Sequence, residues 1–181
     1  MKIELIKGNT YIIKSVTNIG IYKLNENEVY LIDTGATKEL AEELLELLKK
    51  EDLTVKGIIN THSHVDHIGG NKLIQDYFNC EIYINDKEKS MIENTLIEPT
   101  CLLGCKPSYT ILQYWPIQNS KGSDINEISN LFEIIPLYGH SIGHTGIKTK
   151  DNVLFLGDAL AKVSTYDDSR TNSNTIEKAN D

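Results

Sequence analysis

Three histidines and one aspartate fall within six consecutive residues of the stretch INTHSHVDHIGG, directly after the apolar run VKGII. They are His62, His64, Asp66 and His67, and they include three of the five histidines in the chain. The apolar run has turn signals on both sides, which predicts a buried strand whose end delivers the cluster into a loop. Side chains two apart in an extended loop point the same way, so His62 and His64 could bind one ion together. Asp66 and His67 would lie where the loop bends into a helix, within reach of a second ion.

The alternative interpretation is that these histidines cap the helix or lie on a solvated loop. Imidazole suits Zn²⁺ and similar transition metals, and a catalytic metal site needs a few protein ligands and an open position for water. This ligand chemistry, placed directly after a buried strand, favours metal binding over the alternative.

Further donors must come from later in the chain. The motif GHSIGHTG offers His140 and His144, and LFLGDAL offers Asp158. A carboxylate at the end of an apolar strand is costly to bury unless a cation meets it. Asp158 therefore fits a metal bridge better than the alternative role of capping a turn.

The remaining pattern predicts a layered α/β domain. The first thirty or so residues resemble an antiparallel strand meander. The segment TGATKELAEELLELLKKED has leucines at helical spacing, glutamates early and lysines late, and predicts a helix. Strands and helices then alternate to about residue 93, an irregular segment follows to about 129, and three strand-like runs end near residue 160. We expect residues 1–160 to form one domain and residues 161–181 to be a polar tail with little to bury.

The charge of the chain argues against nucleic acid and membranes as binding partners. The 181-residue chain has a net charge of −8 and a sequence pI near 5.1, and it shows no basic patch. The electrostatic field of a negatively charged protein repels nucleic acid and anionic membranes. The N-terminus reads as a first strand and not as a signal peptide, and no apolar run is long enough to span a bilayer. We therefore expect a cytoplasmic protein with a small-molecule substrate.

The motifs THSHVDH, GHSIGHTG and FLGDAL, in this order, resemble the metallo-β-lactamase-fold hydrolases over roughly residues 1–160. The resemblance implies a four-layer αββα sandwich with a dinuclear metal site at one edge of its two sheets. It implies six metal ligands at the matching positions: His62, His64 and His140 on the first ion, Asp66 and His67 on the second, and Asp158 as the bridge.

Two further residues are given supporting roles. Asp33, in LIDTG, matches a family turn beneath the metal loop and is expected to accept hydrogen bonds there without binding metal. His144 lies outside the matched ligand pattern and is expected to shape its loop.

The resemblance implies hydrolysis by a hydroxide that bridges two divalent ions, with zinc as the first candidate and iron or manganese as alternatives. Asp66 would also orient the hydroxide. Many lactamases lack either the histidine at the position of His67 or the carboxylate at the position of Asp158. The presence of both here favours an ester, thioester or lactone substrate over a β-lactam, and a phosphodiester is also less favoured. Tyr109, Tyr114 and Trp115 of the irregular segment either line the substrate pocket or belong to the core.

The chain departs from the family pattern after GDAL. The family usually continues with another strand-and-helix layer and a last histidine that completes the second metal position, whereas no histidine follows His144 here. This departure predicts an incomplete second half of the sandwich, with an uncovered apolar face that favours either a homo-oligomer or poor stability. It also keeps open the alternative of a truncated or vestigial member that binds metal but catalyses weakly.

Overall fold

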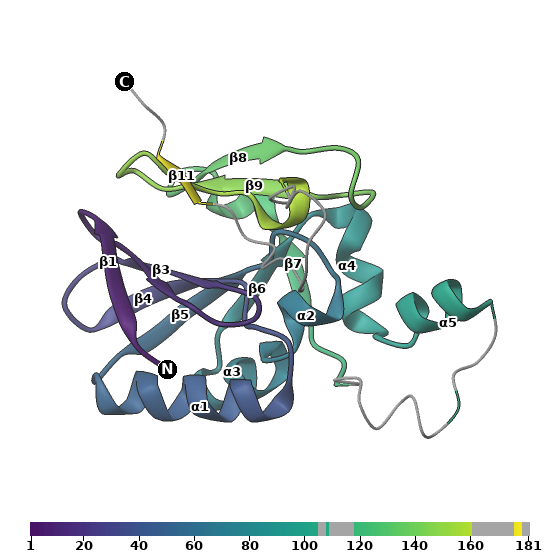
Figure 1. The fold of residues 1–181 in the computed structure, drawn as a ribbon, viewed down its shortest axis with the longest axis horizontal. Coiled ribbons are helices and arrows are strands. Elements are labelled where there is room, and N and C mark those ends of the chain that lie inside the picture. The colour runs from purple at the N-terminus through teal and green to yellow at the C-terminus, as the bar shows by residue number, and fades with distance from the viewer. Residues whose placement is uncertain (105–107, 109–117, 161–175, 179–181) are drawn as a thin grey trace, which may run out of the picture.

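Two β-sheets pack face to face in this protein (Figure 1). The computed structural model describes residues 1–104, 108, 118–160 and 176–178. The large sheet has the order β1-β2-β3-β4-β5-β6-β7, and the small sheet has the order β11-β10-β9-β8. The strands of the large sheet are β1 (Ile3–Lys7), β2 (Thr10–Ile13), β3 (Ile19–Lys23), β4 (Glu28–Ile32), β5 (Thr54–Ile59), β6 (Glu81–Ile84) and β7 (Gly122–Asp124). The strands of the small sheet are β8 (Glu133–Pro136), β9 (Thr145–Lys148), β10 (Val153–Phe155) and β11 (Ile176–Lys178).

The large sheet changes from antiparallel to parallel pairing at β4. Strands β1 to β4 form the predicted antiparallel meander, whereas β4, β5, β6 and β7 pair in parallel. Parallel neighbours need a crossover connection. Helix α1 (Lys38–Lys50) makes the crossover from β4 to β5, and α3 (Asn71–Phe78) makes the crossover from β5 to β6. The carboxyl ends of these strands therefore meet at one edge, where the histidine cluster begins.

Helix α1 confirms the helix predicted in this segment. Thr37 caps it, because its side-chain oxygen accepts a hydrogen bond from the backbone N–H of Leu40 at 3.3 Å. Lys49 and Lys50 lie in the last turn, where positive charge complements the helix dipole. The other helical segments are α2 (Val65–Ile68), α4 (Asp86–Glu93), α5 (Ile97–Leu103) and the 3₁₀ turns η1 (Ile125–Ile128) and η2 (Gly157–Ala159).

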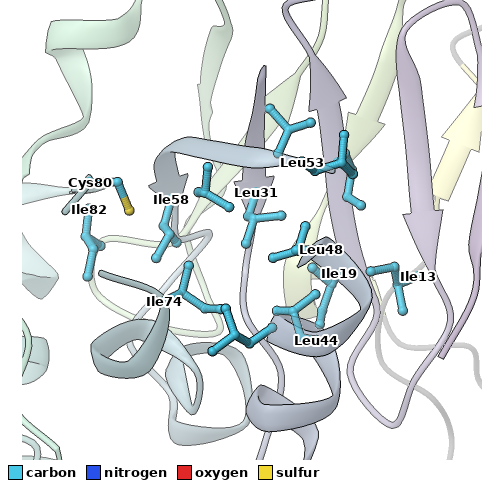
Figure 2. Close-up of a cluster of buried hydrophobic side chains, with 14 of the residues drawn as sticks. Ile13, Ile19, Leu31, Leu44, Leu48, Leu53, Ile58, Ile74, Cys80 and Ile82 are labelled. Atoms are coloured by element: carbon cyan, nitrogen blue, oxygen red, sulfur yellow. The ribbon is translucent and has the colours of Figure 1, made fainter. Parts of the chain in front are cut away.

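The first part of the core lies between the large sheet and its helices. Figure 2 shows Leu44 and Leu48 of α1 and Ile74 of α3 among the sheet residues Leu31 and Ile58. All five side chains are fully buried. Burying an aliphatic side chain of this size contributes about 1.5–3 kcal/mol, so this cluster anchors the strands from which the histidine loop emerges.

The second part of the core lies between the two sheets and is aromatic at its centre. The ring of Phe132 meets those of Tyr22 and Tyr30 edge to face, with centroids 5.2 and 5.5 Å apart. Gly20 lies against the ring of Phe155, and a Cβ at this position would come within 2.7 Å of that ring. The two sheets therefore pack closely against each other at this position, which brings the loops of both sheets together at one edge.

The predicted α/β fold with two packed sheets is confirmed. Figure 1 shows α1 and α3 on one side of the large sheet and the small sheet on the other. The described part of the chain places no helix over the outer face of the small sheet, so three of the four predicted layers are described. None of the described helices combines the length and the apolar character needed to cross a bilayer.

The described parts of the segment from residue 93 to 129, which was predicted to be irregular, include regular elements. They contain α5, β7 and η1. The sequence of β7 is GSD, which lacks apolar residues, and the strand is formed by parallel pairing with β6. Strand β11 lies in the predicted polar tail and pairs with β10. The predicted pocket residues Tyr109, Tyr114 and Trp115 lie outside the described residues, so their role stays a prediction.

Candidate metal centre

The histidine loop begins where β5 ends, and backbone bonds fix it to both neighbouring strands. The N–H of Asp33, after β4, donates to the carbonyl of Ile59 at 2.9 Å, and the N–H of Asn60 donates to the carbonyl of Tyr83 in β6 at 2.9 Å. The loop then turns into α2, for which His64 is the N-terminal cap residue. A loop held at both sides in this way presents its side chains in a fixed arrangement.

Asp33 lies beneath the loop and accepts three hydrogen bonds. Its Oδ1 accepts from the N–H of Thr61 at 2.9 Å, and its Oδ2 accepts from the hydroxyl of Thr61 at 2.8 Å. Oδ2 also lies 2.8 Å from Nδ1 of His67. Because a carboxylate only accepts, Nδ1 of His67 carries the proton. This leaves Nε2 of His67 to face the other candidate ligands.

The same hydrogen-bond chain fixes the proton of His62. The single hydroxyl proton of Thr61 is donated to Asp33, so the oxygen of Thr61 can only accept from Nδ1 of His62, 3.1 Å away. The proton of His62 is therefore on Nδ1. Its Nε2 is left with a lone pair, is buried, and has no hydrogen-bond partner among the described residues.

The structure brings five of the six predicted ligands into two overlapping groups. One group is His62, His64 and His140, the other is His62, His67 and Asp158, and the donor atoms of each group lie within 4.8 Å of one another. Nδ1 of His64 is 2.9 Å from Nε2 of His140, and Nε2 of His67 is 3.1 Å from Oδ1 of Asp158. His62 is common to both groups and stands at the centre of the site.

The other two predicted residues lie at the border of these groups. Asp66 belongs to neither, although its Oδ2 is 3.6 Å from Nε2 of His67 and accepts from the hydroxyl of Thr17 at 3.3 Å. His144 accepts the backbone N–H of Asp158 on its Nε2 at 3.2 Å. His144 therefore contacts the turn that carries Asp158, and its predicted role in shaping its own loop stays a prediction.

The donor set fits a divalent transition metal. Nε2 of His62 is buried without a hydrogen-bond partner in the described part of the chain, and a bound cation would satisfy it. Burial lowers the pKa of His62, and the neighbouring His67 and His64 lower it further, so His62 is neutral, the form that binds metal. Imidazoles with carboxylates suit zinc, iron and related ions.

His67 has the opposite electrostatic surroundings. Burial lowers its pKa, but the carboxylates of Asp33, Asp158 and Asp66 outweigh this effect and raise the pKa to about 10. Without metal, a proton therefore supplies the positive charge among these carboxylates. A metal ion takes over that role and releases the proton, so metal binding is expected to weaken as the pH falls.

Two glutamates beside the site were not predicted from the sequence. Glu88, in the first turn of α4, is fully buried, and Glu98, in the first turn of α5, accepts a hydrogen bond from the backbone N–H of Val65. Acidic residues in a first helical turn are ordinary partners of the helix dipole. The sequence therefore gives no indication that Glu88 and Glu98 lie beside the histidine loop.

Glu98 leads to a prediction for pH dependence. Burial, with smaller effects from Asp66 and Glu88, raises its pKa from 4.5 to about 7. Between these values the folded chain keeps a proton that the unfolded chain loses, so the stability of the metal-free protein falls as the pH rises through this window. We expect Glu98→Gln to stabilise the metal-free protein by roughly 1–2 kcal/mol at pH 8, with allowance for solvent screening, and by much less at pH 5.

Urea unfolding at pH 5 and pH 8, in the presence of a chelator, measures this difference. The exposed Glu127 provides a matched control, and Glu127→Gln should not show the pH-dependent gain. An equal effect of Glu98→Gln at both pH values would contradict the prediction.

Comparison with known proteins gives matches along nearly the whole chain. The profile of the Metallo-beta-lactamase superfamily matches residues 12–179. A hydroxyacylglutathione hydrolase, GloC, of Haemophilus influenzae is 32% identical over 164 residues, which cover 88% of this chain and 72% of that protein. A hydroxyacylglutathione hydrolase of Prochlorococcus marinus is 27% identical over 158 residues, which cover 81% of this chain. The chain spans only 55% of the length of this second relative.

Solved structures give a similar result. The crystal structure of BLEG-1, a B3 metallo-beta-lactamase, superimposes with a TM-score of 0.64 at 31% sequence identity. The superposition covers 81% of this chain and 68% of that one. The described fold is thus shared with a solved metallo-beta-lactamase structure.

Proposed function

Because the chain belongs to the metallo-beta-lactamase superfamily, we propose that it hydrolyses a small-molecule thioester in a metal-dependent reaction. The observation that carries the proposal is the pair of donor groups that share His62. The substrate class is taken from the relatives named as hydroxyacylglutathione hydrolases, since a hydroxyacylglutathione is a thioester. An oxygen ester or a lactone presents a similar acyl carbon and is the next choice.

In this proposal the chain holds two divalent ions. His62, His64 and His140 would hold the first, Asp66 and His67 the second, and Asp158 would contact both. Bound there, divalent ions lower the pKa of water toward neutrality and polarise an acyl oxygen. Zinc is the first candidate, with iron and manganese as alternatives that the same donors accept.

The side chains around the ions have separate tasks. Asp66 has a half-exposed carboxylate, 41% accessible, which can accept a hydrogen bond from the attacking water and hold its orientation. Thr17 donates to Oδ2 of Asp66 and fixes the direction of this carboxylate. Asp33 holds the proton of His67 on Nδ1, away from the reacting atoms. No side-chain nucleophile is needed.

The net charge of −8 supports a small-molecule substrate over nucleic acid, because the field of the protein repels a phosphate backbone. A metal-binding chain that catalyses weakly is the competing candidate. The position of Asp66 outside both close groups favours this competing candidate, because the second ion would then have fewer ligands.

A reconstitution assay distinguishes these candidates. The metal-free protein is supplied with Zn²⁺, Fe²⁺ or Mn²⁺, and hydrolysis is measured on a hydroxyacyl thioester of glutathione, its oxygen-ester analogue, a lactone and a β-lactam. We expect thioester hydrolysis that a chelator abolishes and that exceeds the metal-only buffer by at least about a thousandfold, modest for an enzyme. Two bound ions without hydrolysis of any substrate would contradict the enzymatic proposal and leave a metal-binding protein.

A further inference from the structure

The strongest feature outside the ligand set is the carboxylate of Glu88, on which four hydrogen bonds converge. Its Oε2 accepts from the backbone N–H of Ser63 at 3.0 Å and from the hydroxyl of Ser63. Its Oε1 accepts from the hydroxyl of Ser141 at 2.6 Å and from the backbone N–H of Gly143 at 2.7 Å. Glu88 itself is completely buried.

The two oxygens divide between two histidine loops. Ser63 lies between His62 and His64 on the loop that follows β5 of the large sheet. Ser141 directly follows His140 on the connection between β8 and β9 of the small sheet. A single carboxylate thus ties together the two segments that supply the ligands of the first ion.

The surroundings of Glu88 indicate that its charge is retained. Burial raises its pKa, but the hydrogen bonds from Ser141, Ser63 and Gly143 outweigh burial and lower the pKa below its usual value. The residues that the structure describes offer this carboxylate no ion-pair partner. A buried charge balanced only by hydrogen bonds is costly to maintain. A glutamine at this position would avoid the charge, but its NH₂ group could not accept hydrogen bonds, so the donors on one side would lose their acceptor.

Space around the carboxylate is closed as well. A Cβ on Gly143 would come within 2.7 Å of Cγ of Glu88 and 2.9 Å of Oδ1 of Asn85. The backbone of the second loop therefore lies directly against the side chain of Glu88. A shift of this carboxylate would move both loops.

We infer that Glu88 is a positioning residue that sets the separation of His64 and His140, and through it the affinity of the first metal ion. The inference rests on the proposed metal site. In the structure Nδ1 of His64 and Nε2 of His140 are 2.9 Å apart, although the two residues belong to loops of different sheets. Hydrogen-bonded partners of metal ligands change metal affinity by about 10- to 100-fold when they are removed, and Glu88 acts on two ligands through their chain neighbours Ser63 and Ser141.

The test compares Glu88→Gln with Glu93→Gln in the full chain. Glu93 is an exposed residue of the same helix and is the matched control. Zn²⁺ affinity is measured by competition with a chelator, and the visible absorption bands of Co²⁺ bound in place of zinc report the ligand geometry. We expect Glu88→Gln to weaken Zn²⁺ binding by about 10- to 100-fold and to alter the Co²⁺ bands, with no change in Glu93→Gln.

A second variant keeps the inference testable if Glu88→Gln does not fold. Ser141→Ala removes one hydroxyl donor from Oε1 and leaves the carboxylate in place. We expect it to weaken Zn²⁺ binding several-fold and, combined with Glu88→Gln, to add little further loss.

The outcomes separate the two proposals. Wild-type Zn²⁺ affinity and Co²⁺ bands in both variants, with only a loss of stability in the metal-free protein, would overturn the role of Glu88 and leave the metal centre intact. Failure of the wild-type chain to bind Zn²⁺ or Co²⁺ would overturn both the metal centre and the role of Glu88.

Discussion

Replacing His62 by Ala is expected to remove metal binding more completely than any other single substitution in the cluster. His62 is the member shared by both donor groups, so its loss leaves each group with two donors. His140→Ala, in contrast, leaves His62, His67 and Asp158 together. We expect His62→Ala to lower Zn²⁺ affinity by more than about 100-fold, above the effect usual for a residue that only supports a ligand, and to abolish thioester hydrolysis.

Metal content per chain after dialysis and the melting temperature with and without Zn²⁺ measure this effect. A ligand present at 100 times its Kd stabilises the folded state by about 2.7 kcal/mol, and His62→Ala should lose this gain. His140→Ala serves as the comparison and should retain part of the metal. Equal metal loss in the two variants would show that the two groups do not share His62 in the way the geometry indicates.

Replacing Asp33 by Ala is expected to be the most destabilising change beneath the loop. The N–H of Thr61, the hydroxyl of Thr61 and Nδ1 of His67 would all lose their acceptor in a buried environment. Asp33 also has a φ of 59°, a conformation that Ala tolerates less well than Asp. Together these effects are expected to lower the free energy of unfolding by about 3–5 kcal/mol, measured by urea denaturation of the metal-free protein.

Asp33→Asn separates stability from the control of proton positions. Asn tolerates the same backbone conformation and still accepts from the N–H of Thr61, but its amide group now donates toward Thr61 and His67. His67 can accept that bond only if its proton moves to Nε2, the atom that faces the metal. We therefore expect a folded variant that binds Zn²⁺ about 10- to 100-fold more weakly. Wild-type affinity in Asp33→Asn would contradict the assigned tautomers.

The parts of the molecule that the sequence predicts well are those governed by local rules. The helical spacing and charges of residues 37–50 depend only on neighbours along the chain, and α1 forms there. The histidine cluster is likewise visible because ligand types repeat at short spacing, and its fold family is shown by the profile match. The assignment of each ligand to an ion stays a prediction.

The parts that were missed depend on contacts between distant segments. Strand β7 is polar and three residues long, and it becomes a strand because the edge of β6 is open to it. Glu88 resembles any acidic residue in a first helical turn until its partners Ser63 and Ser141 are placed beside it. Neither feature has a periodicity or a spacing in the sequence, so neither could be inferred without the tertiary structure.

The order of the ligands along the chain has a consequence for biosynthesis. A nascent chain that has emerged as far as β6 has the histidine loop and most of the large sheet, but His140 and Asp158 have yet to be made. The aromatic rings of Tyr22 and Tyr30 are not yet covered by Phe132 in such a chain. An exposed apolar face of this kind is prone to aggregate or to bind chaperones. The full donor set assembles only when the small sheet docks. We therefore expect a chain that lacks the small sheet to bind Zn²⁺ more weakly than the complete fold, because it has only part of the donor set.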